Sequence, residues 1–292
     1  MGNGIPIMRP ISIDTRTIQS GDIFIPIQGK NFDGRDFISD AISKGASILD
    51  VELQSYAKSY RKKLKCPVLA ITGSAGKTTL KDMLTAILGQ TLNVVSTYEN
   101  QNNEIGAPLT LIRADDRTDL VIAECGMRQK GDLKYLAKIL APTHVLITHI
   151  GLTHREFFKS QRGIALGKAE ILQSAPKWQT GTRTAFLPYT SDYKDLLIQT
   201  AQKKHFNILP IATQEIDGIE QNIATCFTVA RHFGVSDDII RKGIEAFETS
   251  SNRLKKIVHQ GITIMNDAYN NNPSGLRFAL SVLRQMPGRK IA

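Results

Sequence analysis

A single segment, residues 72–79, constrains the fold more than any other part of the chain. It reads T-G-S-A-G-K-T-T, with an apolar stretch at 67–71 before it and apolar residues at helical spacing from 80 to 88 after it. A strand, a tight loop and a helix N-terminus in this order direct backbone N–H groups at an anion, and the helix dipole adds to the attraction. Ile71 stands where the G-x-x-x-x-G-K-[ST] pattern has its first glycine. The alternative is an ordinary helix start, in which the glycines only form a turn and the threonines only cap the helix. The flanking strand and helix favour a phosphate-binding loop.

Strands and helices alternate along the rest of the chain. Strands are expected near 67–71, 92–96, 119–124, 144–149, 184–187 and 262–266. This alternation predicts an α/β fold with a mainly parallel sheet covered by helices on both faces. A smaller α/β unit is expected before it, with a strand at 23–25 and helices at 36–44 and 52–65. We therefore predict an N-terminal domain at 1–65, a central phosphate-loop domain at 66–272 and the start of a third domain at 273–292.

Composition narrows the classes of partner and compartment. The chain has 37 Lys and Arg residues against 27 Asp and Glu, and its net charge of +10 favours anionic ligands. We expect no nucleic-acid partner, because no basic tract is interleaved with aromatic residues. The cysteines at 66, 125 and 226 lack metal spacing and favour a reduced, cytoplasmic compartment. No stretch of 18 apolar residues and no signal peptide is visible, so we expect no membrane insertion.

Glu124 is the clearest candidate metal ligand. It ends the apolar run 120–123, and a carboxylate at the carboxyl edge of a parallel strand lies where open α/β sheets bind ligands. From such a place it could coordinate Mg²⁺ beside the Thr78 hydroxyl, while Lys77 reaches a terminal phosphate. An exposed strand-end glutamate is the alternative, and the phosphate loop in the same sheet favours the metal.

Three other features are ambiguous from residue types alone. The polar stretch 98–108 carries three asparagines in four positions, which suits either a ligand-binding loop or a plain one. His154 follows a predicted strand, but a lone histidine is more often structural. Lys168 lies on a predicted helix, where lysine is usually solvated. Its small neighbours, Ala165, Gly167 and Ala169, leave room for close approach or modification.

Several motifs together resemble the Mur ligases, the ATP-dependent enzymes that add amino acids to the UDP-muramoyl peptide precursor of peptidoglycan. The motifs are T-G-S-A-G-K-T-T at 72–79, N-N-E-I-G-A-P at 102–108, A-E-C-G-M at 123–127, H-R-E at 154–156 and I-A-L-G-K-A-E at 164–170. Residues 266–273 resemble the D-x-Y-N-x-N-P element of the branch that joins D-alanyl-D-alanine to a UDP-N-acetylmuramoyl tripeptide. Residues 12–16 and 21–24 resemble the opening of the UDP-binding domain.

The resemblance assigns roles to individual residues. Catalytic roles fall to Lys77, His154 and Lys168. The nucleotide ATP is expected to contact Gly73, Ser74, Ala75, Gly76, Lys77, Thr78, Thr79, Asn222, Arg253, Asp267 and Tyr269. One Mg²⁺ would be held by Thr78 and Glu124, and a second by His154 and a carbamylated Lys168. Contacts to the UDP-muramoyl substrate are expected from Ser12, Thr15, Arg16, Asn102 and Asn103.

The implied function is ATP-dependent amide bond formation through an acyl phosphate, by a monomer in the cytoplasm. The chain departs from the family pattern by a short central domain near 211–217, by Gln221 where a histidine is expected, and by His149 where an asparagine is expected. By resemblance most of a C-terminal domain lies beyond Ala292, so we expect this stretch alone to bind substrates without ligating them. The alternatives are a truncated or divergent homologue that binds nucleotide or UDP-sugar without catalysis, and a P-loop kinase or NTPase of another class.

Overall fold

A six-stranded parallel sheet forms the centre of the molecule. The computed structural model describes residues 10–29, 31–151, 156–176, 182–211, 218–247, 255–267, 276, 279–280, 283–284 and 286–291. The strands are β4 (Val68–Thr72), β5 (Val94–Ser96), β6 (Leu120–Glu124), β7 (His144–Ile147), β8 (Thr184–Pro188) and β9 (Asn207–Ile211). Their order is β5-β6-β4-β7-β8-β9, and every neighbouring pair is parallel. This confirms the predicted α/β class, although β9 was not among the predicted strands.

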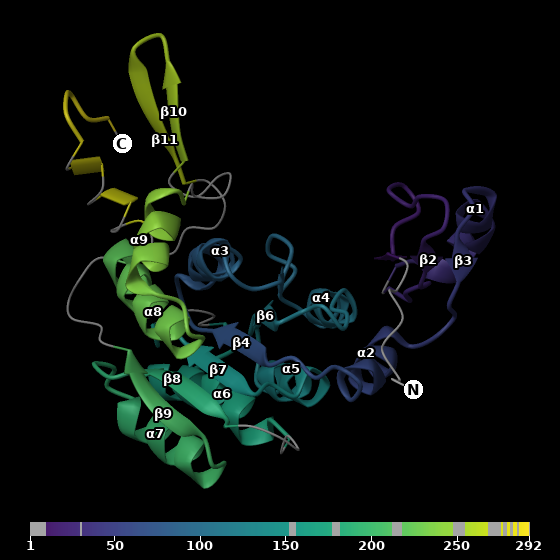
Figure 1. Cartoon of the computed structure of the whole chain (residues 1–292), viewed down its shortest axis with the longest axis horizontal. Coiled ribbons are helices and arrows are strands. Elements are labelled where there is room, and N and C mark those ends of the chain that lie inside the picture. Colours follow the sequence, from purple (N-terminus) through teal and green to yellow (C-terminus); the bar gives the residue numbers. More distant parts are fainter. Residues whose placement is uncertain are drawn as a thin grey trace.

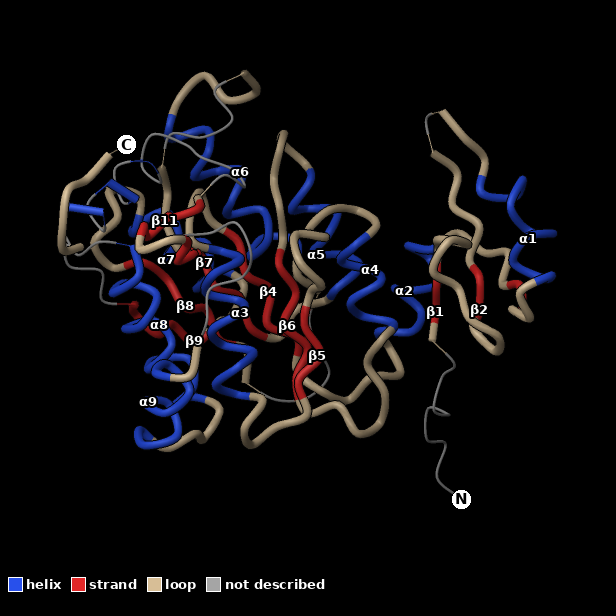
Figure 2. The backbone as a smooth tube through the Cα atoms, turned by 90° about the horizontal axis from the view of Figure 1, so that it is seen from above, coloured by secondary structure: helices blue, strands red, loops and turns tan. Residues whose placement is uncertain are grey.

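Helices cover both faces of this sheet (Figures 1 and 2). One layer contains α3 (Lys77–Leu88), α8 (Gly218–His232) and α9 (Asp237–Glu245). The other contains α4 (Gly106–Ile112), α5 (Asp132–Leu140), α6 (Gln161–Ser174) and α7 (Lys194–Lys203). Along β4, Val68 and Ala70 belong to one apolar core while Leu69 and Ile71 belong to the other. A strand buried on both faces explains the continuous apolar runs in the sequence.

A small unit at the N-terminus stands apart from the main sheet (Figure 1). It contains a parallel three-stranded sheet of β1 (Ile11–Ser12), β2 (Ile23–Phe24) and β3 (Ser47–Ile48), with η1 (Gly34–Phe37) and α1 (Ile38–Ser43). The following helix, α2 (Leu53–Arg61), packs against α4 and α5 of the larger unit. Our domain boundaries, which place α2 in the first domain, remain a prediction.

The predicted strand at 262–266 exists but lies in a different sheet. It is β11 (Ile262–Asn266), which pairs antiparallel with β10 (Lys255–His259) in a separate hairpin (Figure 1). Its placement in the parallel sheet was therefore wrong. The hairpin turn consists of Gln260 and Gly261, both with positive φ, and such a two-residue turn returns the chain beside the preceding strand.

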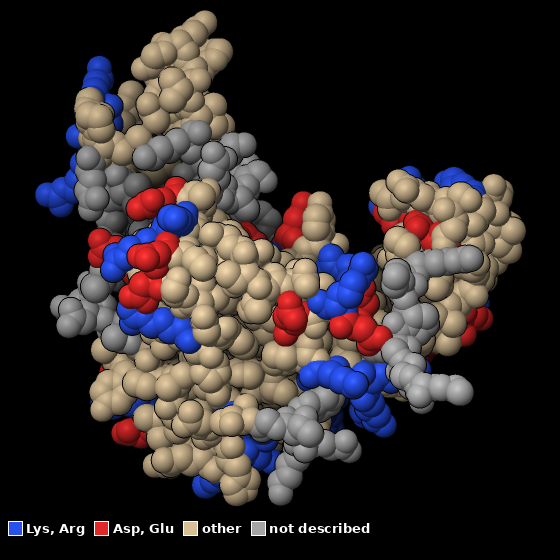
Figure 3. Space-filling view, in the orientation of Figure 1, with Lys and Arg blue, Asp and Glu red and all other residues tan. Residues whose placement is uncertain are grey.

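Surface charge is mixed on the face seen in Figure 3, where Lys and Arg lie beside Asp and Glu in several groups. None of the helices in the described ranges is long and apolar enough to cross a membrane.

Candidate functional site

The predicted phosphate loop connects β4 to α3 at the carboxyl edge of the sheet. Gly73 has a φ of +151° and Gly76 a φ of +76°, values that favour glycine. A Cβ atom at Gly73 would collide with the Thr148 hydroxyl, and one at Gly76 would lie 3.1 Å from Asn222 Oδ1. Gly76 directly precedes α3 and contributes no side chain that could cap the first N–H groups of this helix. The loop therefore has the backbone geometry of an anion cradle.

The loop is held in place by the segment that follows β7. Ser74 N donates to His149 O at 2.8 Å, and Ser74 Oγ accepts from Gly151 N at 3.0 Å. Thr148 Oγ1 donates to Ala75 O at 2.7 Å. These bonds pre-organise the loop before any ligand arrives. No role for Thr148 was predicted from the sequence, because its partner lies 73 residues away in the chain.

Lys77 and Thr78 begin α3 at the end of this loop. Lys77 Nζ donates to Gly73 O at 3.0 Å, which folds the side chain back over the loop. The Thr78 side chain is buried. An ammonium and a hydroxyl at these positions suit a terminal phosphate and its metal ion.

Glu124 lies beside the loop because β6 pairs with β4 in a register that aligns Ile71 with Glu124. The side chain is 1% exposed, and its Oε1 accepts from Asn102 Nδ2 at 2.7 Å. Its Oε2 is buried and has no hydrogen-bond partner within the described ranges. A buried carboxylate oxygen without a partner is costly unless a cation approaches it. This donor fits Mg²⁺, which takes oxygen ligands.

Protein side chains alone do not form a complete metal site in the part of the chain that the structure describes. Those residues contain no group of three or more His, Cys, Asp and Glu side chains that could hold a metal. Mg²⁺ commonly takes only one or two carboxylates and completes its shell with water and substrate phosphates. Thr78 and Glu124 could therefore supply the protein ligands of a metal that arrives with a nucleotide.

Lys168 on α6 is buried, 1% exposed, and close enough to Lys77 for their charges to interact. Burial and the Lys77 charge lower the pKa of Lys168 well below its usual value. The pKa of His149 is lowered too, by burial and then by Lys168. None of the ion pairs among the described residues includes Lys168. A buried amine with a lowered pKa is uncharged and nucleophilic over a wider pH range than a solvated lysine.

The other predicted site residues near this edge of the sheet have different surroundings. Asn222 on α8 is buried beside Gly76. Asn103 Oδ1 accepts from Gly106 N at 3.0 Å and so caps α4. Asp267 follows β11 and is half-buried. Three further predicted residues lie outside the described residues: His154, Arg253 and Tyr269.

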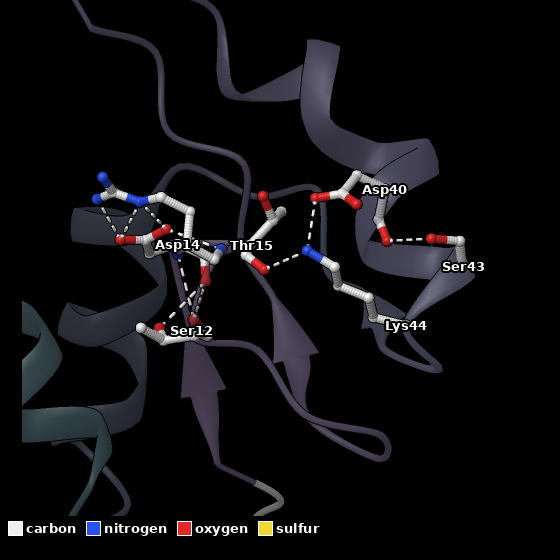
Figure 4. Close-up of polar contacts among 8 residues, drawn as sticks. Ser12, Asp14, Thr15, Asp40, Ser43 and Lys44 are labelled. Carbon is white, nitrogen blue, oxygen red and sulfur yellow. Dashed lines mark hydrogen bonds and ion pairs between the residues drawn. The ribbon is translucent and has the colours of Figure 1, made fainter.

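The N-terminal candidates gather at the turn after β1 (Figure 4). Ser12 Oγ donates to Asp14 O, and the exposed Arg16 pairs with Asp14 at 2.6 Å. Thr15 is buried, and its carbonyl accepts from Lys44 Nζ at 2.9 Å. The Arg16 hydrogen bond holds the pKa of Asp14 at about 2, so this carboxylate stays charged. Lys44, at the C-terminal end of α1, was not predicted as a site residue from the sequence.

Comparison with known proteins supports a single family. The profile of the Mur ligase middle domain matches residues 71–264, and that of the Mur ligase family catalytic domain matches residues 8–99. The UDP-N-acetylmuramoyl-tripeptide–D-alanyl-D-alanine ligase of Bacillus subtilis is 29% identical over 97% of this chain and 71% of its own length. The enzyme of the same name from Buchnera aphidicola is 30% identical over 96% and 72%.

Solved structures agree with this result. MurF from Acinetobacter baumannii superposes with a TM-score of 0.83 and 26% identity, over 95% of this chain and 71% of its own. The MurF ligase of Thermotoga maritima, solved in complex with ADP, shares the fold with a TM-score of 0.77 at 24% identity, over 97% of this chain and 76% of its own. Because the middle-domain profile matches the larger part of this sequence, the chain belongs to the Mur ligase family.

Proposed function

We propose that this protein is an ATP-dependent ligase that joins D-alanyl-D-alanine to a UDP-N-acetylmuramoyl tripeptide, a step of peptidoglycan precursor synthesis. The relatives that carry this name support the substrate pair. The observation that carries the chemistry is Glu124 Oε2, a buried carboxylate oxygen without a partner in the described ranges, beside a glycine loop that opens a helix. A metal-bound nucleoside triphosphate suits both features, because its metal ion can meet the carboxylate oxygen and its phosphates can meet the loop.

In the first step a carboxylate oxygen of the tripeptide attacks the γ-phosphorus of ATP. The bond from that phosphorus to the bridging oxygen breaks, and ADP and an acyl phosphate result. Backbone N–H groups of residues 75–79 would hold the phosphates, and Lys77 would place a positive charge beside them. Mg²⁺ held by Thr78 and Glu124 would neutralise charge on the phosphate oxygens when bound. Residues here position and stabilise rather than form covalent bonds.

In the second step the amino group of D-alanyl-D-alanine attacks the acyl carbon, phosphate leaves, and the nitrogen loses a proton. We assign Lys168 to the same centre in carbamylated form. Its buried, uncharged amine would add to CO₂ and release one proton, which gives a carbamate with two oxygens. With His154, this carbamate would hold a second Mg²⁺, since oxygen donors suit that ion.

Binding of the two nucleotides is assigned to separate residues. Asn222, Arg253, Asp267 and Tyr269 are proposed contacts of ATP besides the loop. Ser12, Thr15, Arg16, Asn102 and Asn103 are proposed contacts of the UDP-muramoyl substrate. A cytoplasmic location and a monomeric state remain predictions.

The test is ADP release by the full protein, measured with each substrate omitted in turn. Release should require both the UDP-muramoyl tripeptide and D-alanyl-D-alanine. Lys77→Met should lower turnover by roughly 100-fold or more, because it removes a charge from a water-poor phosphate site. Lys138→Met, at an exposed position of α5, is the matched control and should keep the parental rate. Nucleotide binding without substrate-dependent ADP release would instead favour the non-catalytic homologue.

A further inference from the structure

One buried lysine near the candidate site has no role in the mechanism above. Lys81 lies on α3, one helical turn after Lys77, and its side chain is 2% exposed. Its Nζ donates to Thr97 O at 2.8 Å and to Glu99 O at 3.0 Å, and it pairs with Asp82 Oδ1 at 2.6 Å. An ammonium group has three donors, so these acceptors match its capacity. A buried ammonium is costly unless it is paired and hydrogen-bonded, and these three partners meet that condition.

Both carbonyls belong to the loop between β5 and α4. Glu99 in this loop has a φ of +46°, which is uncommon for a residue other than glycine. Such a conformation persists only where surrounding contacts hold it. The bond from Lys81 to Glu99 O is one of those contacts, so Lys81 stabilises the local path of this loop.

The same loop contacts Glu124 on two sides. Thr97 Oγ1 accepts from Glu124 N at 2.9 Å, and Asn102 Nδ2 donates to Glu124 Oε1 at 2.7 Å. Asn102 O also accepts from Gly126 N at 2.7 Å. The loop therefore determines how the Glu124 carboxylate is oriented at the end of β6.

We infer that Lys81 is a positioning residue for the nucleotide-bound Mg²⁺, because it ties the helix that carries Thr78 to the loop that orients Glu124. This inference rests on the proposed function, in which Thr78 and Glu124 share the metal. Lys81 touches neither metal nor substrate in this scheme. It fixes the relative position of the two ligands, Thr78 on α3 and Glu124 on β6. Residues that orient metal ligands without touching the metal typically lower metal affinity by ~10- to 100-fold when they are replaced.

The test measures metal binding directly, without turnover. Mn²⁺ is titrated into the full protein saturated with the β,γ-imido analogue of ATP, and free Mn²⁺ is followed by electron paramagnetic resonance. Lys81→Met should weaken Mn²⁺ binding by about tenfold or more. Binding of the analogue in the presence of EDTA should be unchanged, because the phosphate loop remains intact. Lys81→Gln, which keeps two N–H donors, is the milder second variant with the same expected direction, and it decides the question if Lys81→Met does not fold.

Arg61→Met is the matched control for loss of a buried cation that binds backbone carbonyls. Arg61 is 1% exposed and donates to Leu140 O at 2.9 Å and Leu64 O at 3.1 Å, away from the loop. It should reduce thermal stability and leave Mn²⁺ affinity at the parental value. Parental Mn²⁺ affinity in a folded Lys81 variant would overturn the inference alone. A parent protein that does not bind the analogue would overturn the proposed function, and this inference with it.

Discussion

The side-chain amide of Asn102 donates a 2.7 Å hydrogen bond to Glu124 Oε1, and this bond turns the other carboxylate oxygen toward a position without a protein partner in the described ranges. Asn102 comes from the loop before α4, and Glu124 ends β6. The asparagine thus takes up one oxygen of the pair and leaves the second for a cation. This relationship makes the role of Glu124 testable by an isosteric change.

Glu124→Gln should keep the shape of the side chain and remove its charge. We expect Mg²⁺-dependent ADP release to fall by roughly 100-fold or more, since a neutral amide neither attracts nor ligates a hard cation as well. Glu104→Gln, an exposed glutamate in the same loop, is the control. The rate is measured across a Mg²⁺ titration, and a variant at position 124 with the parental Mg²⁺ dependence would contradict the assignment.

Gly76→Ala tests the anion cradle against ordinary backbone strain. The φ of +76° disfavours alanine, and the new Cβ would lie 3.1 Å from Asn222 Oδ1. Gly234→Ala provides the comparison, because its φ is +81° and its Cβ would meet nothing within 4 Å. Both changes should cost about 1 kcal/mol in the free energy of unfolding. Only Gly76→Ala should weaken ATP binding, measured by calorimetry; equal ATP affinity in the two variants would argue against a phosphate site at this loop.

Lys168 should carry a carbamate when the protein is equilibrated with CO₂. Its amine is buried and has a lowered pKa because of that burial and the Lys77 charge, so the nucleophilic form is available. The parent with ¹³C-labelled CO₂ should give a carbamate resonance by NMR that is lost in Lys168→Ala. Lys134→Ala, exposed on α5, should retain it. A short carboxylic acid should restore part of the activity of Lys168→Ala, whereas chloride at equal ionic strength should not. A parental spectrum without the resonance would refute carbamylation.

Acid should destabilise the protein through His144. Its Nε2 lies 3.1 Å from His232 Nε2, and burial followed by the His232 charge lowers the His144 pKa from 6.5 to about 4. Between pH 6.5 and about 4 the unfolded state therefore binds a proton at His144 that the folded state does not bind. The stabilisation from this group is complete above pH 6.5, is lost progressively as the pH falls from 6.5, and has gone once the pH has fallen through about 4, with a limit of ~3 kcal/mol.

Urea unfolding across this pH range measures the effect. His144→Gln cannot titrate and should show a flatter loss of stability between pH 6.5 and about 4. His259→Gln, at an exposed position of β10, should keep the parental slope. An identical slope in the His144 variant would show that other groups cause the acid sensitivity.

Local patterns in the sequence were enough to predict the phosphate loop and most of the central sheet. Apolar runs such as 120–123 predict buried strands because a strand covered on both faces needs apolar side chains on both of them. The place of Glu124 at a strand end followed from the same pattern. The loop at Gly73 and Gly76 was predicted because a tight loop before a helix needs backbone conformations that other residues avoid.

The tertiary structure alone decided which distant groups meet. Lys81 contacts carbonyls 16 and 18 residues away, and Thr148 contacts one 73 residues away. Periodicity reports which face of an element is apolar, but it carries no information on which backbone oxygen lies opposite a given polar side chain. That depends on strand order, register and the path of each loop, as with β11, whose pattern predicted a strand but not its antiparallel partner β10. The sequence thus determined where the candidate nucleotide site lies, and the packing of α3 against the loop from β5 to α4 decided how the Glu124 carboxylate is oriented.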